Sequence, residues 1–204
     1  MKIKVCGLKE SNNIKQVIGL NVDFVGFIFY DKSARHVKLT NELIDTINNL
    51  KIKKIGVFVD ENLNEVIRIK TLLSLDYIQL HGNESVAYCK HLLAHSKIIK
   101  VFKVDDDFDF SVCEPFQFVD YFLFETKGKL KGGNGIKFNW QKLENYKLKT
   151  PFFLSGGIRA KDVNELLMLN HPKLAVVDVN SGFEIQAGIK NIEQLKKFKN
   201  ELSS

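Results

Sequence analysis

The sequence predicts an α/β fold, a single (β/α)8 barrel of eight parallel strands with a reduced fifth helix, formed by residues 1–204 as one domain. Three observations support this prediction. Eight short segments, most of them apolar throughout, follow one another along the chain, as expected of parallel strands covered on both faces. Segments with helical spacing of apolar residues lie between them. Polar or glycine-containing turns follow every strand, and only a closed barrel brings eight such turns to one rim.

The candidate strands are rich in β-branched and aromatic residues and end at glycine or polar residues. They are Ile3–Cys6, Phe24–Phe29, Lys54–Val59, Tyr77–Leu80, Ile98–Val104, Tyr121–Glu125, Phe152–Ser155 and Ala175–Val179. An open, doubly wound sheet could show the same alternation of strands and helices. No Gly-x-Gly-x-x-Gly turn follows the first strand, which runs into Cys6-Gly7-Leu8-Lys9, and this favours the barrel.

The connections between the strands differ in their helical pattern. Val66, Ile69 and Leu73 show the spacing of an amphipathic helix, and a lysine-rich amphipathic helix, Ile192–Phe198, closes the chain. The fifth connection, 105–120, is aromatic and acidic with weak periodicity. We therefore expect a reduced or irregular helix there.

Composition and charge exclude several classes of protein. The chain has 204 residues, 45% of them hydrophobic, which suffices for the core of one domain. Its formal charge of +6 comes from lysines and arginines scattered along the chain. Nucleic-acid binding would require them in a cluster, so no nucleic-acid partner is expected. No apolar run is long enough to cross a bilayer and none resembles a signal peptide, so we expect no membrane association and no export.

The three cysteines, Cys6, Cys89 and Cys113, have no paired spacing, so neither disulfides nor a metal site is predicted. Reduced thiols indicate the cytoplasm. Cys89 and Cys113 are expected in a helix and in an irregular loop, as structural residues. Cys6 ends a buried strand, where a cysteine is ordinarily an inert apolar residue, unless an ionisable partner such as Glu125 shares its rim.

In a barrel of this kind, catalytic residues lie at the carboxyl ends of the strands. The other candidates there are Arg35, Gln79, His81 and Asp178. Arg35 offers a planar fork suited to a carboxylate, although a surface ion pair explains it nearly as well. Gln79 and His81 could equally be satisfied polar residues of the barrel top.

Two glycine turns follow the seventh and eighth strands, where barrels commonly bind phosphate through backbone N–H groups. The candidate phosphate-binding residues are Gly156, Gly157, Ser181 and Gly182. The alternative is that these glycines only make tight turns. A further cluster, Gly132–Gly135, is interpreted as a loop that can fold over a ligand.

Over nearly its whole length the chain resembles the phosphoribosylanthranilate isomerases of tryptophan biosynthesis. Each matching stretch is weak by itself, and their order and spacing are specific. They are Lys4-Val5-Cys6-Gly7-Leu8, Gly26-Phe27-Ile28-Phe29 with Ser33-Ala34-Arg35-His36-Val37, Gly56-Val57-Phe58-Val59, Ile78-Gln79-Leu80-His81-Gly82, Gly132-Gly133-Asn134-Gly135 with Phe138-Asn139-Trp140, Leu154-Ser155-Gly156-Gly157, and residues 177–184 leading to Gly188-Ile189-Lys190.

The resemblance implies an Amadori rearrangement of N-(5-phosphoribosyl)anthranilate to 1-(2-carboxyphenylamino)-1-deoxyribulose 5-phosphate, without a cofactor. Cys6 matches the family's general base and Arg35 the residue that holds the anthranilate carboxylate. The two glycine turns match the phosphate site, and Asp178 is expected to contact the substrate or to order the rim. The general acid of the family is usually an aspartate, whereas this chain has Glu125, one methylene longer. We expect Glu125 to serve as the acid nonetheless.

Two other functions remain open from the sequence. A related sugar-phosphate barrel isomerase or synthase would share the phosphate site, but such enzymes typically use a lysine or a pair of carboxylates. A catalytically impaired barrel that binds a phosphorylated ligand would explain the unusual Glu125. The expected partner is in every case a small molecule, and the chain could be a monomer or a homodimer.

Overall fold

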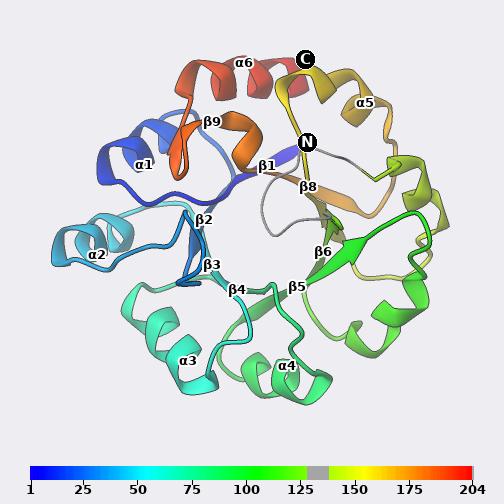
Figure 1. Cartoon of the computed structure of the whole chain (residues 1–204), viewed down its shortest axis with the longest axis horizontal. Helices are drawn as coiled ribbons and strands as arrows, with labels where there is room; N and C mark the ends of the chain where they lie inside the picture. Colours follow the sequence, from blue (N-terminus) through cyan, green and yellow to red (C-terminus); the bar gives the residue numbers. More distant parts are fainter. Residues whose placement is uncertain (128–137, 204) are drawn as a thin grey trace.

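The protein is described by a computed structural model that covers residues 1–127 and 138–203. Eight parallel strands pair in chain order and β8 pairs with β1, which closes the barrel (Figure 1). The strands are β1 Lys2–Val5, β2 Phe24–Ile28, β3 Lys53–Phe58, β4 Tyr77–Leu80, β5 Lys97–Val104, β6 Tyr121–Thr126, β7 Phe152–Leu154 and β8 Leu174–Val179. The predicted α/β barrel is confirmed, and every predicted strand boundary lies within one residue of the observed one.

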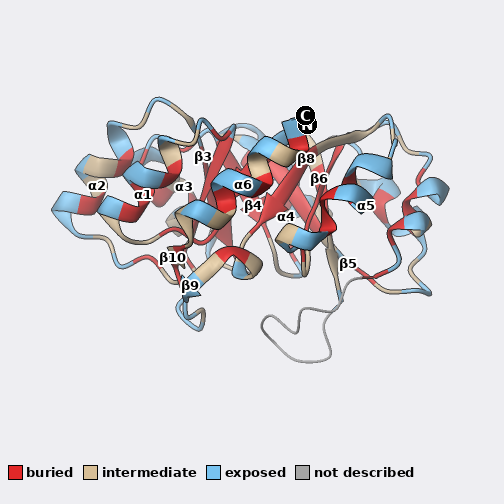
Figure 2. Ribbon diagram, turned by 90° about the horizontal axis from the view of Figure 1, so that it is seen from above, coloured by how far each residue is buried: buried red, intermediate tan, exposed pale blue. Residues whose placement is uncertain are grey.

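Helices surround the barrel and face it with their apolar sides (Figures 1 and 2). They are α1 Ser11–Ile18, α2 Asn41–Asn48, α3 Leu63–Leu72, α4 Val86–Leu93, α5 Val163–Met168, preceded by the short 3-10 helix η3 Ala160–Asp162, and α6 Ile192–Ser203. Polar side chains stabilise the free N–H groups at several helix starts: Thr40, Asn62 and Ser85 cap α2, α3 and α4. No described helix is long and apolar enough to cross a membrane.

The fifth and sixth connections replace α-helices with 3-10 turns, η1 Phe110–Phe116 and η2 Trp140–Asn145. The reduced fifth helix was predicted, and Pro115 within it lacks the N–H that an α-helix needs. Aromatic rings pack these segments onto the barrel: the Phe110 ring lies 5.2 Å from that of Phe124, which lies 5.2 Å from that of Tyr146. Large rings thus fill space that a longer helix would otherwise cover.

The barrel has two apolar layers. Inside the barrel, a small cluster fills the space between the strands: Phe24, Ile55, Tyr77, Ile99, Val101, Leu123, Phe153 and Val176. Outside the barrel, the other faces of the strands pack against the helices in a larger core. Because side chains alternate along a strand, the residues that follow the inner cluster by two positions point toward the barrel axis nearer the carboxyl ends.

After β8 the chain forms the short 3-10 turn η4 Ser181–Phe183 and an antiparallel hairpin, β9 Glu184–Gln186 and β10 Ile189–Lys190, which the sequence did not predict. The hairpin lies at the end of the barrel opposite the two chain termini (Figure 2). It therefore belongs to the rim that carries the candidate residues. The predicted loop Gly132–Gly135 lies outside the described residues.

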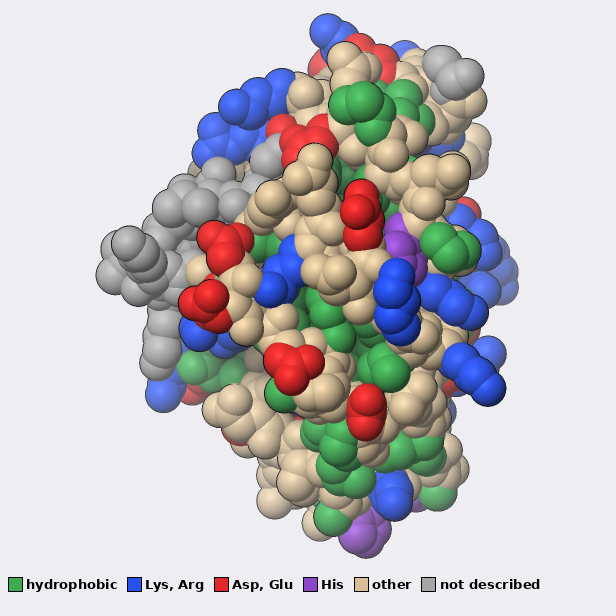
Figure 3. Space-filling model, turned by 90° about the vertical axis from the view of Figure 1, so that its right-hand side faces the viewer, with side chains coloured by type: hydrophobic (Ala, Val, Ile, Leu, Met, Phe, Trp, Pro, Cys, Tyr) green, Lys and Arg blue, Asp and Glu red, His purple; other side chains and the backbone are tan. Residues whose placement is uncertain are grey.

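Lysine and arginine side chains are interspersed with aspartate and glutamate on the face shown in Figure 3. This distribution agrees with the scattered charges of the sequence. Buried ion pairs are formed by Lys4 with Asp178 and by Lys190 with Glu184.

Candidate active site

A buried ion pair lies between the first and last strands of the barrel. Lys4 Nζ contacts Asp178 Oδ2 at 3.0 Å and Gln79 Oε1 at 2.6 Å, and the Lys4 side chain is completely buried. Lys4 and Asp178 are direct neighbours in the pairing of β1 with β8. Burial acts to lower the pKa of Lys4, but the negative charge of Asp178 and its hydrogen bond to the ammonium act against burial, and the pKa is raised. Lys4 is therefore a cation at neutral pH, inside the barrel mouth.

Cys6 follows β1 on the same face as Lys4, two residues on, and is 4% exposed. Its backbone N–H donates to the carbonyl of Val179 at 2.9 Å, which continues the β1–β8 pairing and fixes the thiol at the rim. Burial raises the pKa of the Cys6 thiol, while the neighbouring Lys4 ammonium acts to lower it. The free protein therefore holds Cys6 mainly as a thiol, next to a cation that stabilises the thiolate.

We expect the alkylation rate of Cys6 to rise about tenfold per pH unit between pH 7 and 8, because the thiolate is the reactive form and its pKa lies above the usual value. Iodoacetamide labelling followed by peptide mass spectrometry measures this rate. Cys89 and Cys113 are internal controls: both are fully buried, and burial raises their pKa to about 11 and about 12. A labelling rate of Cys6 that levels off near pH 7 would contradict the assignment.

Cys89 lies in α4, as predicted, whereas Cys113 lies in η1 and not in an irregular loop. All three cysteines are free thiols.

An imidazole and a carboxylate form a second contact, between β4 and β6. His81 Nε2 lies 2.8 Å from Glu125 Oε2, and His81 Nδ1 lies 3.1 Å from Gln79 Nε2. Both side chains are partly exposed, 24% for His81 and 30% for Glu125. Burial acts to raise the pKa of Glu125, but His81 and the neighbouring lysines outweigh it and lower the pKa. Glu125 is thus a carboxylate in the free protein, held toward His81.

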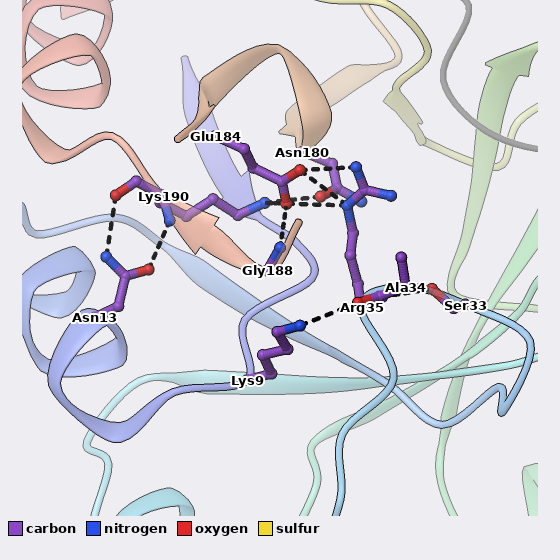
Figure 4. A network of polar contacts seen from close by, with 9 residues as sticks. All are labelled: Lys9, Asn13, Ser33, Ala34, Arg35, Asn180, Glu184, Gly188 and Lys190. Carbon is purple, nitrogen blue, oxygen red and sulfur yellow. Dashed lines mark hydrogen bonds and ion pairs between the residues drawn. The ribbon is translucent and has the colours of Figure 1, made fainter. Parts of the chain in front are cut away.

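Arg35, in the loop after β2, forms a two-pronged ion pair with Glu184 of β9 (Figure 4). Nε and Nη2 donate to the carboxylate at 2.9 and 2.7 Å. Lys190 of β10 contacts the same carboxylate at 2.7 Å and Asn180 at 2.7 Å. Burial acts to raise the pKa of Glu184, but Arg35 and Lys190 outweigh it and lower the pKa. The hairpin therefore fixes one edge of the Arg35 guanidinium, while its remaining nitrogen points away from Glu184 (Figure 4).

The two glycine turns lie against neighbouring backbone. Gly156 and Gly157 have φ of +93° and +71°, a region that favours glycine. A Cβ on Gly156 would collide with the backbone of Thr126 at the end of β6, and one on Gly182 would collide with the carbonyl of Ile158. The turns after β7 and β8 are therefore packed together. Among the described residues, no hydrogen-bond acceptor is found for the N–H groups of Gly156, Gly157, Ser181 and Gly182.

Sequence reasoning missed three residues of this rim: Lys4, Glu184 and Lys190. Lys4 carried a usable signal, because a lysine two residues before Cys6 in an apolar strand must point to the same face. Glu184 and Lys190 lie in strands of three and two residues, too short to produce a pattern.

A closed parallel barrel with its ionisable side chains gathered at the carboxyl ends of the strands defines the class of (β/α)8-barrel enzymes. Within that class, a family model described as N-(5'-phosphoribosyl)anthranilate (PRA) isomerase matches residues 3–201. The chain belongs to this family, and it is therefore an isomerase of tryptophan biosynthesis.

Individual relatives agree with this assignment over nearly full length. An N-(5'-phosphoribosyl)anthranilate isomerase of Parabacteroides distasonis is 42% identical over 202 residues, which cover 97% of this chain and 91% of the relative. The crystal structure of phosphoribosyl anthranilate isomerase from Thermotoga maritima is similar with a TM-score of 0.90 at 26% identity, covering 100% of this chain and 98% of the other. A phosphoribosyl anthranilate isomerase in complex with reduced 1-(o-carboxyphenylamino)-1-deoxyribulose 5-phosphate has a TM-score of 0.86 at 24% identity, with coverage of 100% and 98%.

Proposed function

We propose that this chain converts N-(5-phosphoribosyl)anthranilate to 1-(2-carboxyphenylamino)-1-deoxyribulose 5-phosphate, with Cys6 as general base and Glu125 as general acid. The observation that carries the proposal is that a thiol beside a buried lysine and a carboxylate beside an imidazole stand at the same barrel rim. Family membership supports the substrate. The partner is then a small anionic molecule. A monomer or homodimer and a cytoplasmic location remain predictions.

The two groups act on different atoms of the sugar. Glu125, in its protonated form, donates a proton to the furanose ring oxygen, and the ring opens to a Schiff base. Cys6, as thiolate, removes the proton at C2 and forms an enolamine, which tautomerises to the ketose. Lys4 stabilises the thiolate electrostatically. The C1–O bond of the ring breaks as the C=N bond forms, and the later proton shifts reduce C1 and oxidise C2 of the same molecule, so the reaction balances without an external oxidant or reductant.

The remaining rim residues bind and orient the substrate. The free edge of Arg35 suits the anthranilate carboxylate, because Glu184 already fixes the guanidinium plane. The N–H groups of Gly156, Gly157, Ser181 and Gly182 suit the phosphate. Asp178 Oδ1 is buried and has no hydrogen-bond partner among the described residues, so it can accept a hydrogen bond from a sugar hydroxyl. Holding both ends of the substrate fixes the ring between base and acid.

Glu125→Gln is expected to lower kcat by about 10²–10⁴-fold, because it removes the proton donor but keeps the size of the side chain. Substrate turnover by fluorescence measures the loss. Glu125→Asp, which retains a carboxyl group, is the control and should lose much less activity. Near-normal turnover by Glu125→Gln would refute the assignment of the acid.

The pH dependence of the residual activity gives a further readout of the same variant. The native enzyme needs the base deprotonated and the acid protonated. Between the lowered pKa of Glu125 and the raised pKa of Cys6, a rise in pH removes protonated acid and adds thiolate in equal proportion. Its kcat/KM should therefore be flat between about pH 5 and 8. Glu125→Gln needs only the thiolate. Its residual kcat/KM should therefore rise about tenfold per pH unit across the same range.

Substrate specificity distinguishes this function from that of a related sugar-phosphate barrel isomerase. The protein should convert phosphoribosylanthranilate and leave an aminoaldose of histidine biosynthesis unchanged. Binding of phosphoribosylanthranilate without product would instead favour the impaired, ligand-binding barrel.

A further inference from the structure

Gln79 lies between the side chains assigned as base and acid. It is 1% exposed and stands on the inner face of β4, two residues after Tyr77 and two before His81. Its Oε1 lies 2.6 Å from Lys4 Nζ, and its Nε2 lies 3.1 Å from His81 Nδ1. Lys4 precedes Cys6 by two residues on the same face of β1 and acts on its pKa, and His81 contacts Glu125. A chain of polar contacts therefore joins Lys4, the cation that acts on the base, to the acid.

The chemistry of these groups fixes the direction of each hydrogen bond. A lysine ammonium only donates, so the Gln79 atom that faces Lys4 must be the oxygen. The amide NH2 of Gln79 then faces His81, so Nδ1 must accept and carry no proton. A neutral imidazole has one N–H, which is then on Nε2 and donates to Glu125 Oε2 at 2.8 Å.

We propose that Gln79 is a positioning residue that holds His81 as the neutral Nε2–H tautomer, and thereby leaves Glu125 able to carry the proton used for ring opening. The inference rests on the proposed role of Glu125 as general acid. A neutral imidazole orients the carboxyl group through one hydrogen bond, whereas an imidazolium would add a full positive charge beside it and favour the carboxylate. Protonation of Nδ1 would cost the hydrogen bond from the buried Gln79 amide.

The charges around Glu125 explain why His81 has to stay neutral. The charged groups that face Glu125 and His81 come from three strands: Lys4 of β1, Lys103 of β5 and Asp178 of β8. The hydrogen bond that His81 donates and the charges of the two lysines lower the pKa of Glu125, against the effect of burial. The acid form is already disfavoured in the free protein. A second proton on His81 would therefore reduce the population of active enzyme directly.

The test is Gln79→Glu, which replaces the amide donor by a carboxylate that accepts from both neighbours. We expect Glu at 79 to draw a proton onto Nδ1 and convert His81 to imidazolium. In nitrogen-15 NMR spectra of the histidine-labelled protein at pH 7, native His81 should show a protonated Nε2 and a bare Nδ1, and Gln79→Glu should show both nitrogens protonated. We expect kcat to fall about tenfold or more, with KM nearly unchanged. The His81 signals, among those of five histidines, are identified by their loss in His81→Asn.

Gln141→Glu is the matched control, because Gln141 is exposed and the charge change is the same. It should leave kcat and the His81 signals as in the native protein. A native spectrum with Nδ1 protonated would overturn the inference, and so would Gln79→Glu with unchanged His81 signals and unchanged kcat. If Gln79→Glu fails to fold, two other measurements still test the inference. They are the native spectrum and the spectrum of Gln79→Met, which should show a mixture of His81 tautomers. The NMR result does not depend on turnover, so an error in the role of Glu125 would appear separately, as normal activity of Glu125→Gln.

Discussion

Cys6→Ala is expected to lower kcat about a thousandfold, within the range that a general base contributes, while KM changes little. The reason is that Cys6 acts on the C2 proton, whereas Arg35 and the glycine turns supply the proposed binding contacts. Steady-state fluorescence assays with purified native protein and variant measure both constants. The residual kcat/KM should fall about tenfold per pH unit from pH 6 to 8, because only the protonated acid is then required.

Cys89→Ala is the matched control for Cys6→Ala. Cys89 is also a buried free thiol, but it lies in α4, outside the rim. Its replacement should leave kcat unchanged. Activity of Cys6→Ala within tenfold of the native protein would contradict the role of Cys6, and an equal loss in Cys89→Ala would point to a general effect on the fold.

Lys4→Met is expected to lower the free energy of unfolding by about 3–5 kcal/mol, because it leaves the buried Asp178 carboxylate without its cation. Urea denaturation followed by circular dichroism measures this loss. kcat should fall as well, because the Cys6 thiolate loses the positive charge that stabilises it.

The double variant Lys4→Met, Asp178→Leu separates stability from catalysis. Replacing both members of a buried ion pair by apolar residues is often nearly neutral for stability, so most of the free energy of unfolding should return. Activity should not return, because both charges are absent from the rim. If Lys4→Met alone unfolded at the same urea concentration as the native protein, the Lys4–Asp178 ion pair would not stabilise the fold.

The barrel could be predicted because parallel strands buried on both faces appear in the sequence as short, nearly continuous apolar runs. The predicted strand Tyr77–Leu80 has the same bounds as β4 of the structure, since its apolar run ends at His81-Gly82. The reduced fifth helix was also predicted, because the segment 105–120 lacks helical periodicity. The 3-10 turn η2 was not expected; Tyr146, which follows it, packs against distant aromatic residues such as Phe124, and no local pattern records these contacts.

The sequence predicted part of the candidate site, but not Lys4, Glu184 and Lys190, and not the contacts between its side chains. Arg35 and Glu184 are 149 residues apart, and nothing local to either indicates that they pair. Gln79 and His81 were predicted either to bind substrate or to be satisfied polar residues of the barrel top; the structure shows Gln79 bonded to Lys4 and His81 to Glu125, and substrate binding stays a prediction. The longer side chain of Glu125, which the sequence presents only as a departure from the family pattern, lies at hydrogen-bonding distance from His81.

The central claim is tested most directly by following the fluorescence of phosphoribosylanthranilate in the presence of the native protein. Enzymatic isomerisation predicts loss of substrate at a rate proportional to protein concentration, with formation of the carboxyphenylamino deoxyribulose phosphate, and nearly complete loss of that rate in Cys6→Ala. Substrate decay no faster than in buffer alone would contradict the account.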